Sequence, residues 1–159
     1  MTTPEIIVRP ALAEDANSVG ELAHQFAGYL RSLGDCTDFN LTADRYLRDG
    51  FGSHPAFTGL VAEVNGSVIG YLLCHFGYDS DAAAINLHIV DLYVDAEARK
   101  RGAGRALMAK AAHFARAAGA QEMIWSVYHA NKLATTFYEA LGAERITEVF
   151  FMKLKADAL

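Results

Sequence analysis

The segment 91–105 constrains the fold most, because an apolar strand runs there into a basic, glycine-containing turn and then directly into a helix. Gly102 and Gly104 allow successive backbone N–H groups to converge on one point without Cβ atoms in the way. The apolar residues that follow have helical spacing: Ala106, Leu107, Met108, Ala111, Phe114, Ala115 and Ala118. A turn at the start of a helix offers unpaired N–H groups and the positive end of the helix dipole. The segment therefore predicts a phosphate-binding turn between a strand and a helix.

Four basic residues surround this turn, Arg99, Lys100, Arg101 and Arg105, in a chain of formal net charge -5. This local concentration of positive charge indicates a pyrophosphate-sized anion rather than a generally basic surface. Solvated basic side chains on an ordinary connection are the alternative that spacing alone leaves open. Two other glycine motifs do not fit. A dinucleotide fingerprint needs a small residue where Leu107 stands, and a P-loop needs Gly-Lys followed by Ser or Thr.

The pattern of apolar residues predicts alternating strands and helices along the rest of the chain. Asn65-Gly66 between two apolar runs is the strongest hairpin signal. Strands are predicted at 6–9, 57–64, 68–76, 84–94, 122–128 and 146–154. Helices are predicted at 13–33, from the Thr42 cap to 48, after the glycine turn, and at 132–141. This order predicts an α/β fold in which helices flank a central sheet.

Composition limits the classes of protein that fit. A chain of 159 residues that is 52% hydrophobic is long enough for a sizeable core, and we expect a single domain over 1–159. No apolar run is long enough to span a membrane and no signal segment is evident, so we expect a cytoplasmic protein without membrane association. Cys36 and Cys74 predict ordinary thiols, and the scattered histidines predict no metal site. The acidic balance argues against nucleic-acid binding.

The turn also carries a family resemblance. Arg99-Lys-Arg-Gly-Ala-Gly104 is similar to the Arg/Gln-x-x-Gly-x-Gly/Ala signature of the GNAT superfamily of acyl-coenzyme A-dependent N-acyltransferases. The likeness extends over nearly all of the chain: 86–94 looks like the family's central strand, and 124–131 with 137–143 looks like the next strand and helix. Within the family, the chain resembles the polyamine and thialysine acetyltransferases. The resemblance implies a mostly antiparallel sheet, splayed between strands 84–94 and 122–128, and acetyl-CoA as cosubstrate.

The resemblance also implies where the cofactor binds. Its pyrophosphate is expected at the turn and helix start, at Arg99, Lys100, Arg101, Gly102, Ala103, Gly104 and Arg105. Its pantetheine arm is expected beside Leu92, Tyr93 and Val94, with Leu92 and Val94 as main-chain contacts in the manner of an added strand. Asn131 is otherwise a good helix cap, and the family suggests a polar contact with the same arm.

The chemistry needs an acid and a base. Tyr138 follows Asn131 at the spacing of the tyrosine that the family commonly uses as general acid toward the coenzyme A sulfur. A phenol pKa near ~10 and a thiol pKa near ~8.5 are close enough for proton transfer after modest tuning. Polyamine-type relatives carry two adjacent acids on the central strand, but Val90-Asp91 matches only the second. His88 and Asp91 are the candidate bases, and they lie on opposite faces of a regular strand unless a bulge intervenes.

Two acidic segments, 32–40 and 77–82, are candidates for the acceptor pocket. Their charge and aromatic face suit a cationic amine, although solvated turns explain them equally well. The residues concerned are Asp35, Asp38, Tyr78, Asp79 and Asp81. We expect acetyl transfer to a primary amine of a small cationic or amino-acid-derived molecule, by direct attack in a ternary complex. A protein lysine or N-terminal acetyltransferase and a non-catalytic acyl-CoA sensor are the alternatives.

The C-terminal run Val149-Phe-Phe-Met152 puts bulky groups on both faces of the predicted last strand. Burial by a helix on one face and by a second subunit on the other suits this pattern, and so does packing within one chain. Many members of the family pair through late strands or exchanged C-terminal segments, so the resemblance implies a homodimer.

Overall fold

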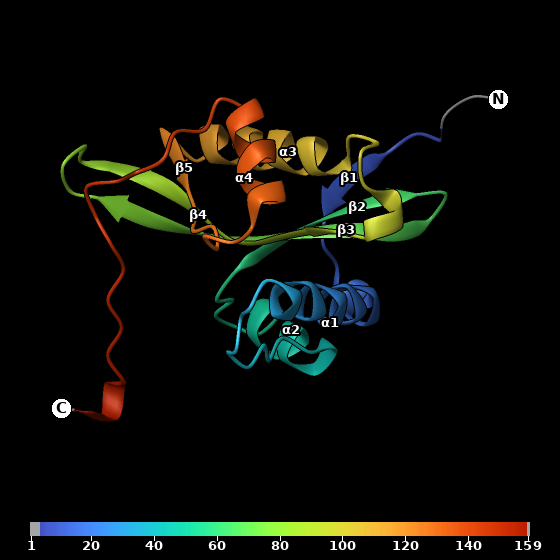
Figure 1. Ribbon diagram of the computed structural model, residues 1–159. Coiled ribbons are helices and arrows are strands. Elements are labelled where there is room, and N and C mark those ends of the chain that lie inside the picture. Colours follow the sequence, from blue (N-terminus) through green and yellow to red (C-terminus); the bar gives the residue numbers. More distant parts are fainter. Residues whose placement is uncertain (1–3, 159) are drawn as a thin grey trace.

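The computed structural model describes residues 4–158, which form one five-stranded sheet with helices on both faces (Figure 1). The strands lie in chain order: β1 (Ile7–Pro10), β2 (Thr58–Val64), β3 (Ser67–Asp79), β4 (Ala84–Val94) and β5 (Glu122–Ile124). Neighbouring strands are antiparallel except for β4 and β5, which are parallel. The mixed, mostly antiparallel sheet predicted from the sequence is confirmed.

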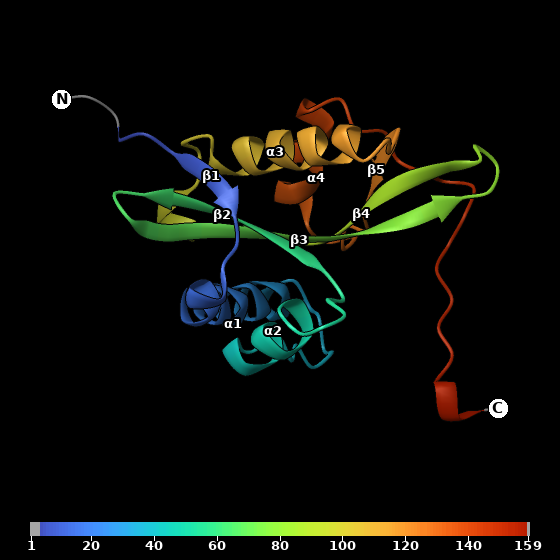
Figure 2. The same ribbon diagram turned by 180° about the vertical axis from the view of Figure 1, so that it is seen from behind.

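The helices form two layers. Helices α1 (Ala16–Ser32) and α2 (Ala43–Gly50) lie on one face of the sheet, and α3 (Ala103–Ala117) and α4 (Lys132–Ala140) lie on the other, as Figures 1 and 2 both show. Each layer encloses its own core. The core under α1 and α2 includes Val19, Tyr46, Val61, Tyr71, Leu73 and Tyr93. The core under α3 includes Leu72, Cys74, Leu87, Ile89, Leu107 and Ala111.

Local signals in the sequence account for several boundaries. Asn65 and Gly66 both have positive φ, 50° and 78°, which is the conformation that a tight hairpin turn between β2 and β3 requires. Thr42 Oγ1 accepts a 3.3 Å hydrogen bond from the N–H of Arg45, so Thr42 caps α2 as predicted. The first predicted helix begins with a short 3-10 turn, Ala13–Asp15, and becomes α-helical at Ala16.

The predicted strand at 146–154 is wrong for this structure. The segment 144–155 contains no strand and runs away from the sheet (Figures 1 and 2), ending in a short 3-10 turn, Ala156–Ala158. Phe150 and Phe151 are 83% and 81% exposed. The predicted strand at 122–128 is also shortened to β5. The apolar pattern of 146–154 predicts burial, but within residues 4–158 this segment pairs with no strand.

Two irregularities of β4 position the functional site. Leu73 of β3 lies opposite Asp91, whereas the next residue, Cys74, lies opposite Ile89, so Val90 is an extra residue in a β-bulge. On its other side, β4 pairs with β5 only from Asn86 to His88. β5 ends at Ile124, opposite His88, so within residues 4–158 the rest of β4 has no paired strand on that edge. This confirms the splay that the family resemblance implied.

Candidate active site

The gap between β4 and β5 exposes a strand edge. The N–H of Asp95 donates a 2.9 Å hydrogen bond to Ile69 O in β3. Because antiparallel pairing alternates sides along a strand, the backbone groups of Val94 and Leu92 face the gap instead. The Val94 carbonyl accepts a 3.0 Å bond from Arg99 Nε. The edge at Leu92 is therefore not paired with β3, and the contact with an extended, amide-containing ligand that the resemblance implies stays a prediction.

The glycine turn has the backbone conformation of an anion site. Lys100 and Gly102 have positive φ, 61° and 94°, and Gly102 forms the N-cap of α3 without any side-chain capping bond. A Cβ on Gly102 would meet no atom within 4 Å, so the space in front of the helix start is open. The first turn of α3 contains no acidic residue. Its backbone donors can therefore bind phosphate oxygens.

Gly104 has a different role from the one predicted. A Cβ at this position would lie 3.2 Å from Phe137 Cζ in α4, and the φ of Gly104 is not positive. Contact between helices α3 and α4, rather than close approach of a ligand, explains the glycine here.

The four predicted cations divide into two groups. Lys100, Arg101 and Arg105 are exposed around the start of α3. The guanidinium carbon of Arg99 instead lies 5.1 Å from the ring centroids of both Tyr29 and Tyr93. Arg99 is therefore held between aromatic rings and the Val94 carbonyl, and the expectation that it belongs to the cation cluster is corrected.

Tyr138 comes from α4 and packs against Trp125, with ring centroids 4.9 Å apart, and against Phe137 at 5.1 Å. Burial raises the pKa of Tyr138 to about 12, and the negative charge of Asp91 acts in the same direction. The phenol thus stays protonated at neutral pH. Its pKa is further above that of a thiol than the sequence alone suggested.

Asp91 occupies the bulge. Burial raises its pKa to about 6, and the nearby Tyr71 hydroxyl opposes that rise. A carboxylate with this pKa is mostly ionised at neutral pH and accepts a proton far more readily than an ordinary surface aspartate. Asp91 and Tyr138 are also close enough for the charge of one to affect the pKa of the other.

The bulge also decides where His88 lies. Leu87 and Ile89 face the α3 core whereas Tyr93 faces the α1 core, so β4 changes face at Val90. Alternation therefore places His88 on the face that Asp91 shares with Tyr93. The His88 ring stacks on His75 of β3, with centroids 4.9 Å apart and planes 7° from parallel. Burial lowers the pKa of His88, and His75 lowers it further.

Asn131 caps α4 and is 8% exposed. Its Oδ1 accepts hydrogen bonds from the N–H of Ala134 at 3.1 Å and from the hydroxyl of Tyr29 at 2.8 Å. The carbonyl side of the amide is thus used within the protein, and only the NH₂ group remains for the predicted contact with a cofactor.

The five predicted acceptor residues do not come together in the structure. Asp35 accepts two hydrogen bonds within its own turn, and Asp38 is exposed in the same loop. Asp79 accepts from the backbone of Asp81 and of the residue after it. Tyr78 is 68% exposed. The tip of the β3–β4 hairpin projects away from α1 and α2 (Figure 1), so the two acidic segments do not wall one pocket within the chain.

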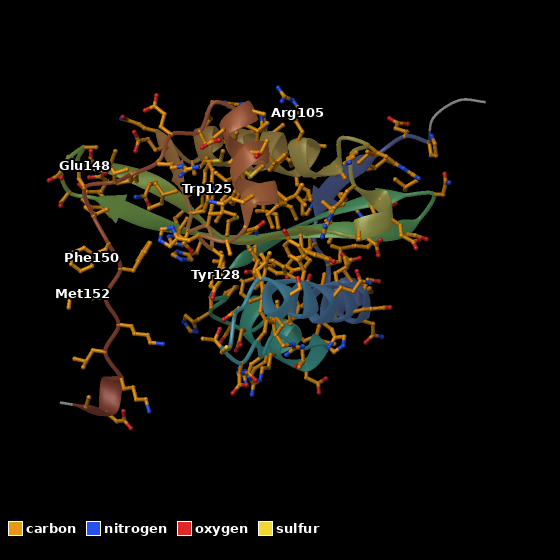
Figure 3. The ribbon with its side chains drawn as sticks, in the orientation of Figure 1. Arg105, Trp125, Tyr128, Glu148, Phe150 and Met152 are labelled. Carbon is orange, nitrogen blue, oxygen red and sulfur yellow. The ribbon has the colours of Figure 1, made fainter. Side chains whose placement is uncertain are left out.

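A groove of about 340 Å³ lies between α3, β5 and the end of α4. Its lining is mostly apolar: Arg105, Met108, Met123, Trp125, Leu141 and Ala143. Figure 3 shows Trp125 near the centre of the molecule, while Phe150 and Met152 extend from the separate C-terminal segment.

Four side chains around the site were not predicted from the sequence: Tyr29, Tyr71, His75 and Trp125. Tyr71 and His75 lie in the predicted hairpin, but their position relative to Asp91 and His88 depends on the β3–β4 register. The turn at 80–83 that joins β3 to β4 lacks an Asn-Gly pair like the one between β2 and β3, so the sequence did not predict that register or its bulge.

Comparison with known proteins identifies the class. The model of the acetyltransferase (GNAT) family matches residues 24–143, and the chain belongs to this family. It is similar to thialysine N-epsilon-acetyltransferases of Bos taurus, with 31% identity over 90% of this chain and 86% of the relative, and of Mus musculus, with 37% identity over 89% and 85%. An integron cassette protein from V. cholerae has the same fold, with a TM-score of 0.77, 20% identity and coverage of 96% of this chain and 93% of that one.

Among residues 4–158, no helix combines the length and apolarity needed to cross a bilayer. The histidine, cysteine and acidic side chains of the same residues form no group of three or more that could hold a metal ion.

Proposed function

We propose that the protein is an acetyl-CoA-dependent N-acetyltransferase whose acceptor is a primary amine on a small cationic or amino-acid-derived molecule. One observation carries the proposal: a partly buried carboxylate, Asp91, is close enough to a partly buried phenol, Tyr138, to raise its pKa, and Asp91 lies just beyond the point where the β4–β5 pairing ends. These groups can take a proton from an amine and give one to a leaving thiolate. The relatives named thialysine N-epsilon-acetyltransferases support a small amine as acceptor.

The chain has the features that acetyl-CoA binding needs. The open, uncapped start of α3 suits the pyrophosphate, and Lys100, Arg101 and Arg105 add positive charge. The free edge of β4 at Leu92 suits the pantetheine amides, and its N–H is the candidate donor to the thioester carbonyl. When bound, acetyl-CoA supplies the acetyl group as an activated thioester.

Asp91 is the proposed base. An alkylamine with a pKa near ~10.4 is almost fully protonated at neutral pH, so the acceptor must lose a proton before it can attack. That proton passes from the ammonium nitrogen to a carboxylate oxygen of Asp91, and the nitrogen keeps the electron pair. Once Asp91 is neutral, its charge no longer raises the pKa of Tyr138. Deprotonation of the amine thus makes Tyr138 a better acid.

Direct attack by the amine is favoured over a covalent enzyme intermediate. Cys74 belongs to the α3 core, and burial raises its pKa to about 11, so it is not a thiolate at neutral pH. Cys74 is therefore not a nucleophile, and Cys36 is an exposed residue of the loop after α1.

We also propose a homodimer in which the segment 144–155 of each subunit packs against the other. Its side chains are too apolar and too exposed for an isolated chain, as Phe150, Phe151 and Met152 illustrate. β5 ends the sheet and the apolar groove lies beside it, so this edge suits an added strand. Sedimentation analysis should give the mass of two chains for the natural protein. Replacement of both Phe150 and Phe151 by Asp should give one chain; an unchanged dimer would contradict this interface.

The activity is tested by thiol release from acetyl-CoA in the presence of polyamines, diamines, free amino acids, aminoglycosides and peptides. We expect turnover with one class of small amine, and loss of that turnover in Asp91→Asn with retained acetyl-CoA binding. Binding of acetyl-CoA without turnover on any small amine or peptide would instead favour a sensor. Turnover on peptides alone would favour a protein acetyltransferase.

A further inference from the structure

The hydroxyl of Tyr71 is fully buried and forms no hydrogen bond. The other tyrosines around this core are different. Tyr46 donates to Leu12 O at 3.1 Å, Tyr29 donates to Asn131 Oδ1 at 2.8 Å, and Tyr93 lies 3.5 Å from Gln25 Oε1. A buried hydroxyl without a partner costs free energy that a phenylalanine would avoid. A tyrosine here therefore requires an explanation beyond packing.

The strand register places Tyr71 beside Asp91. Tyr71 lies opposite Tyr93, and Asp91 lies opposite Leu73, so Tyr71 and Asp91 are diagonal neighbours across β3 and β4. The bulge at Val90 turns Asp91 onto the face where Tyr71 lies. The pair stops short of a hydrogen bond of good geometry, yet each group affects the other: Asp91 raises the pKa of the already buried Tyr71, and Tyr71 lowers that of Asp91.

We propose that Tyr71 is a positioning residue for Asp91: its hydroxyl donates a hydrogen bond to one oxygen of the ionised carboxylate and leaves the other oxygen for the acceptor amine. This inference rests on the proposed function. In the step it serves, an N–H bond of the ammonium breaks, an O–H bond forms on Asp91, and the electron pair stays on nitrogen. Tyr71 keeps its own proton throughout, because burial holds its pKa well above the usual value.

The proposed hydrogen bond from Tyr71 opposes the effect of burial on the protonation of Asp91. A carboxyl group removed from water favours its protonated form, which is useless as a base. A fixed donor favours the ionised form and also orients the carboxylate. Two titratable groups are linked to Asp91: Tyr71 from β3, which lowers the pKa of Asp91, and Tyr138 from α4, whose pKa the charge of Asp91 raises. Tyr93 and Tyr29 lie on the same face with Arg99 over their rings.

The test compares Tyr71→Phe with Tyr46→Phe, an equally buried tyrosine whose hydroxyl has a partner. Loss of a hydrogen bond to a charged group raises the pKa of Asp91 by about one unit. In Tyr71→Phe, the acidic limb of the kcat/KM profile should therefore move up by about one pH unit, with most activity recovered at high pH. Its Tm should fall only above about pH 6, where Asp91 is ionised, because the lost hydroxyl donates to the carboxylate and not to the protonated form. Tyr46→Phe should lower the Tm and leave the limb in place.

A second readout needs no turnover. Titration of the Asp91 carboxyl by carbon NMR should give a pKa about one unit higher in Tyr71→Phe than in the natural protein. An unchanged Asp91 pKa, or an unmoved limb together with a lower Tm, would overturn the proposal and leave Tyr71 a structural residue. Absence of turnover on every amine would overturn the proposed function instead, and the NMR result would still decide whether Tyr71 acts on Asp91.

Discussion

The hydroxyl of Tyr29 donates a 2.8 Å hydrogen bond to Oδ1 of Asn131, across 102 residues of sequence. This bond joins α1, on one face of the sheet, to the first turn of α4, on the other. The same Oδ1 accepts from the N–H of Ala134 and so begins the helix that carries Tyr138. The side chain that the family resemblance assigned to the cofactor is thus also a structural link between the two layers.

Two substitutions of Asn131 separate these roles. Asn131→Ala removes the helix cap and the Tyr29 bond and should cost about 2 kcal/mol of folding free energy, measured by urea unfolding. Asn131→Asp keeps the oxygen that accepts both hydrogen bonds and should remain within about 0.5 kcal/mol of the natural protein. Because it replaces the NH₂ donor, Asn131→Asp should still weaken acetyl-CoA binding in calorimetry. Normal affinity would show that Asn131 is structural only.

Gly102 and Gly119 allow a matched test of the phosphate turn. Both have positive φ, 94° and 82°, both face open space, and they lie at opposite ends of α3. Alanine at either position should cost roughly 1 kcal/mol through backbone strain. Only Gly102→Ala should also weaken acetyl-CoA affinity, because only this turn offers its N–H groups to a phosphate. Equal affinities in the two variants would contradict the turn as the binding site.

Arg99 and Arg105 should respond in opposite ways to replacement by glutamine. Arg99→Gln removes the bond to the Val94 carbonyl and the contacts with two tyrosine rings, so stability should fall by roughly 1 to 2 kcal/mol. Arg105→Gln removes an exposed cation, so stability should hold while acetyl-CoA affinity falls and depends less on salt. Thermal unfolding and calorimetry at two salt concentrations give both comparisons; a stable Arg99→Gln with weak binding would return Arg99 to the phosphate site.

Signals that act between near neighbours in sequence made most of the fold predictable. Asn65-Gly66 fixed a hairpin, Thr42 capped a helix, and the glycine turn marked the start of α3. The candidate residues Asp91 and Tyr138 were also identified, through spacing and resemblance. What the sequence did not reveal depends on contacts between distant segments: the bulge at Val90, and the turn of Arg99 toward Tyr29.

The strand predicted at 146–154 was wrong for a related reason. Its apolar pattern predicts burial, but a pattern does not state which surface provides it. Phe150 and Phe151 are both exposed in the structure. In the proposed homodimer, a second chain provides that surface. The spacing of apolar residues in one sequence does not reveal such a partner.

Burial of Asp91 should lower the stability of the folded protein when the carboxyl group is ionised. Its pKa of about 6 in the folded protein exceeds the usual 3.8, so folding favours the protonated form. The carboxyl group therefore stabilises the fold less as pH rises from about 4 to about 6, and the full cost applies above that range. Asp91→Asn should gain on the order of 2 to 3 kcal/mol at pH near 8 and almost nothing near pH 4, by urea unfolding. A gain equal at both values would mean that Asp91 does not titrate as described.

Tyr138→Phe tests the acid directly. Phenylalanine preserves the ring contacts with Trp125 and Phe137, so folding and acetyl-CoA affinity should be unchanged. Without the proton donor, kcat should fall by about a hundredfold or more. Because the pKa of Tyr138 is about 12, the natural enzyme should lose no activity through this group as pH rises toward about 10.

Tyr128→Phe is the control for Tyr138, since Tyr128 is exposed on the segment after β5 (Figure 3) and should tolerate loss of its hydroxyl. The measurements are kcat over a pH series, by stopped-flow or steady-state kinetics, and the dissociation constant of acetyl-CoA. Together they separate a loss of catalysis from a loss of binding. A kcat near normal in Tyr138→Phe would remove the acid from the mechanism and imply that the thiolate leaves unprotonated. A thiol with a pKa near ~8.5 can also leave as the unprotonated thiolate. Only a loss of kcat of about a hundredfold would therefore show that Tyr138 acts as the acid.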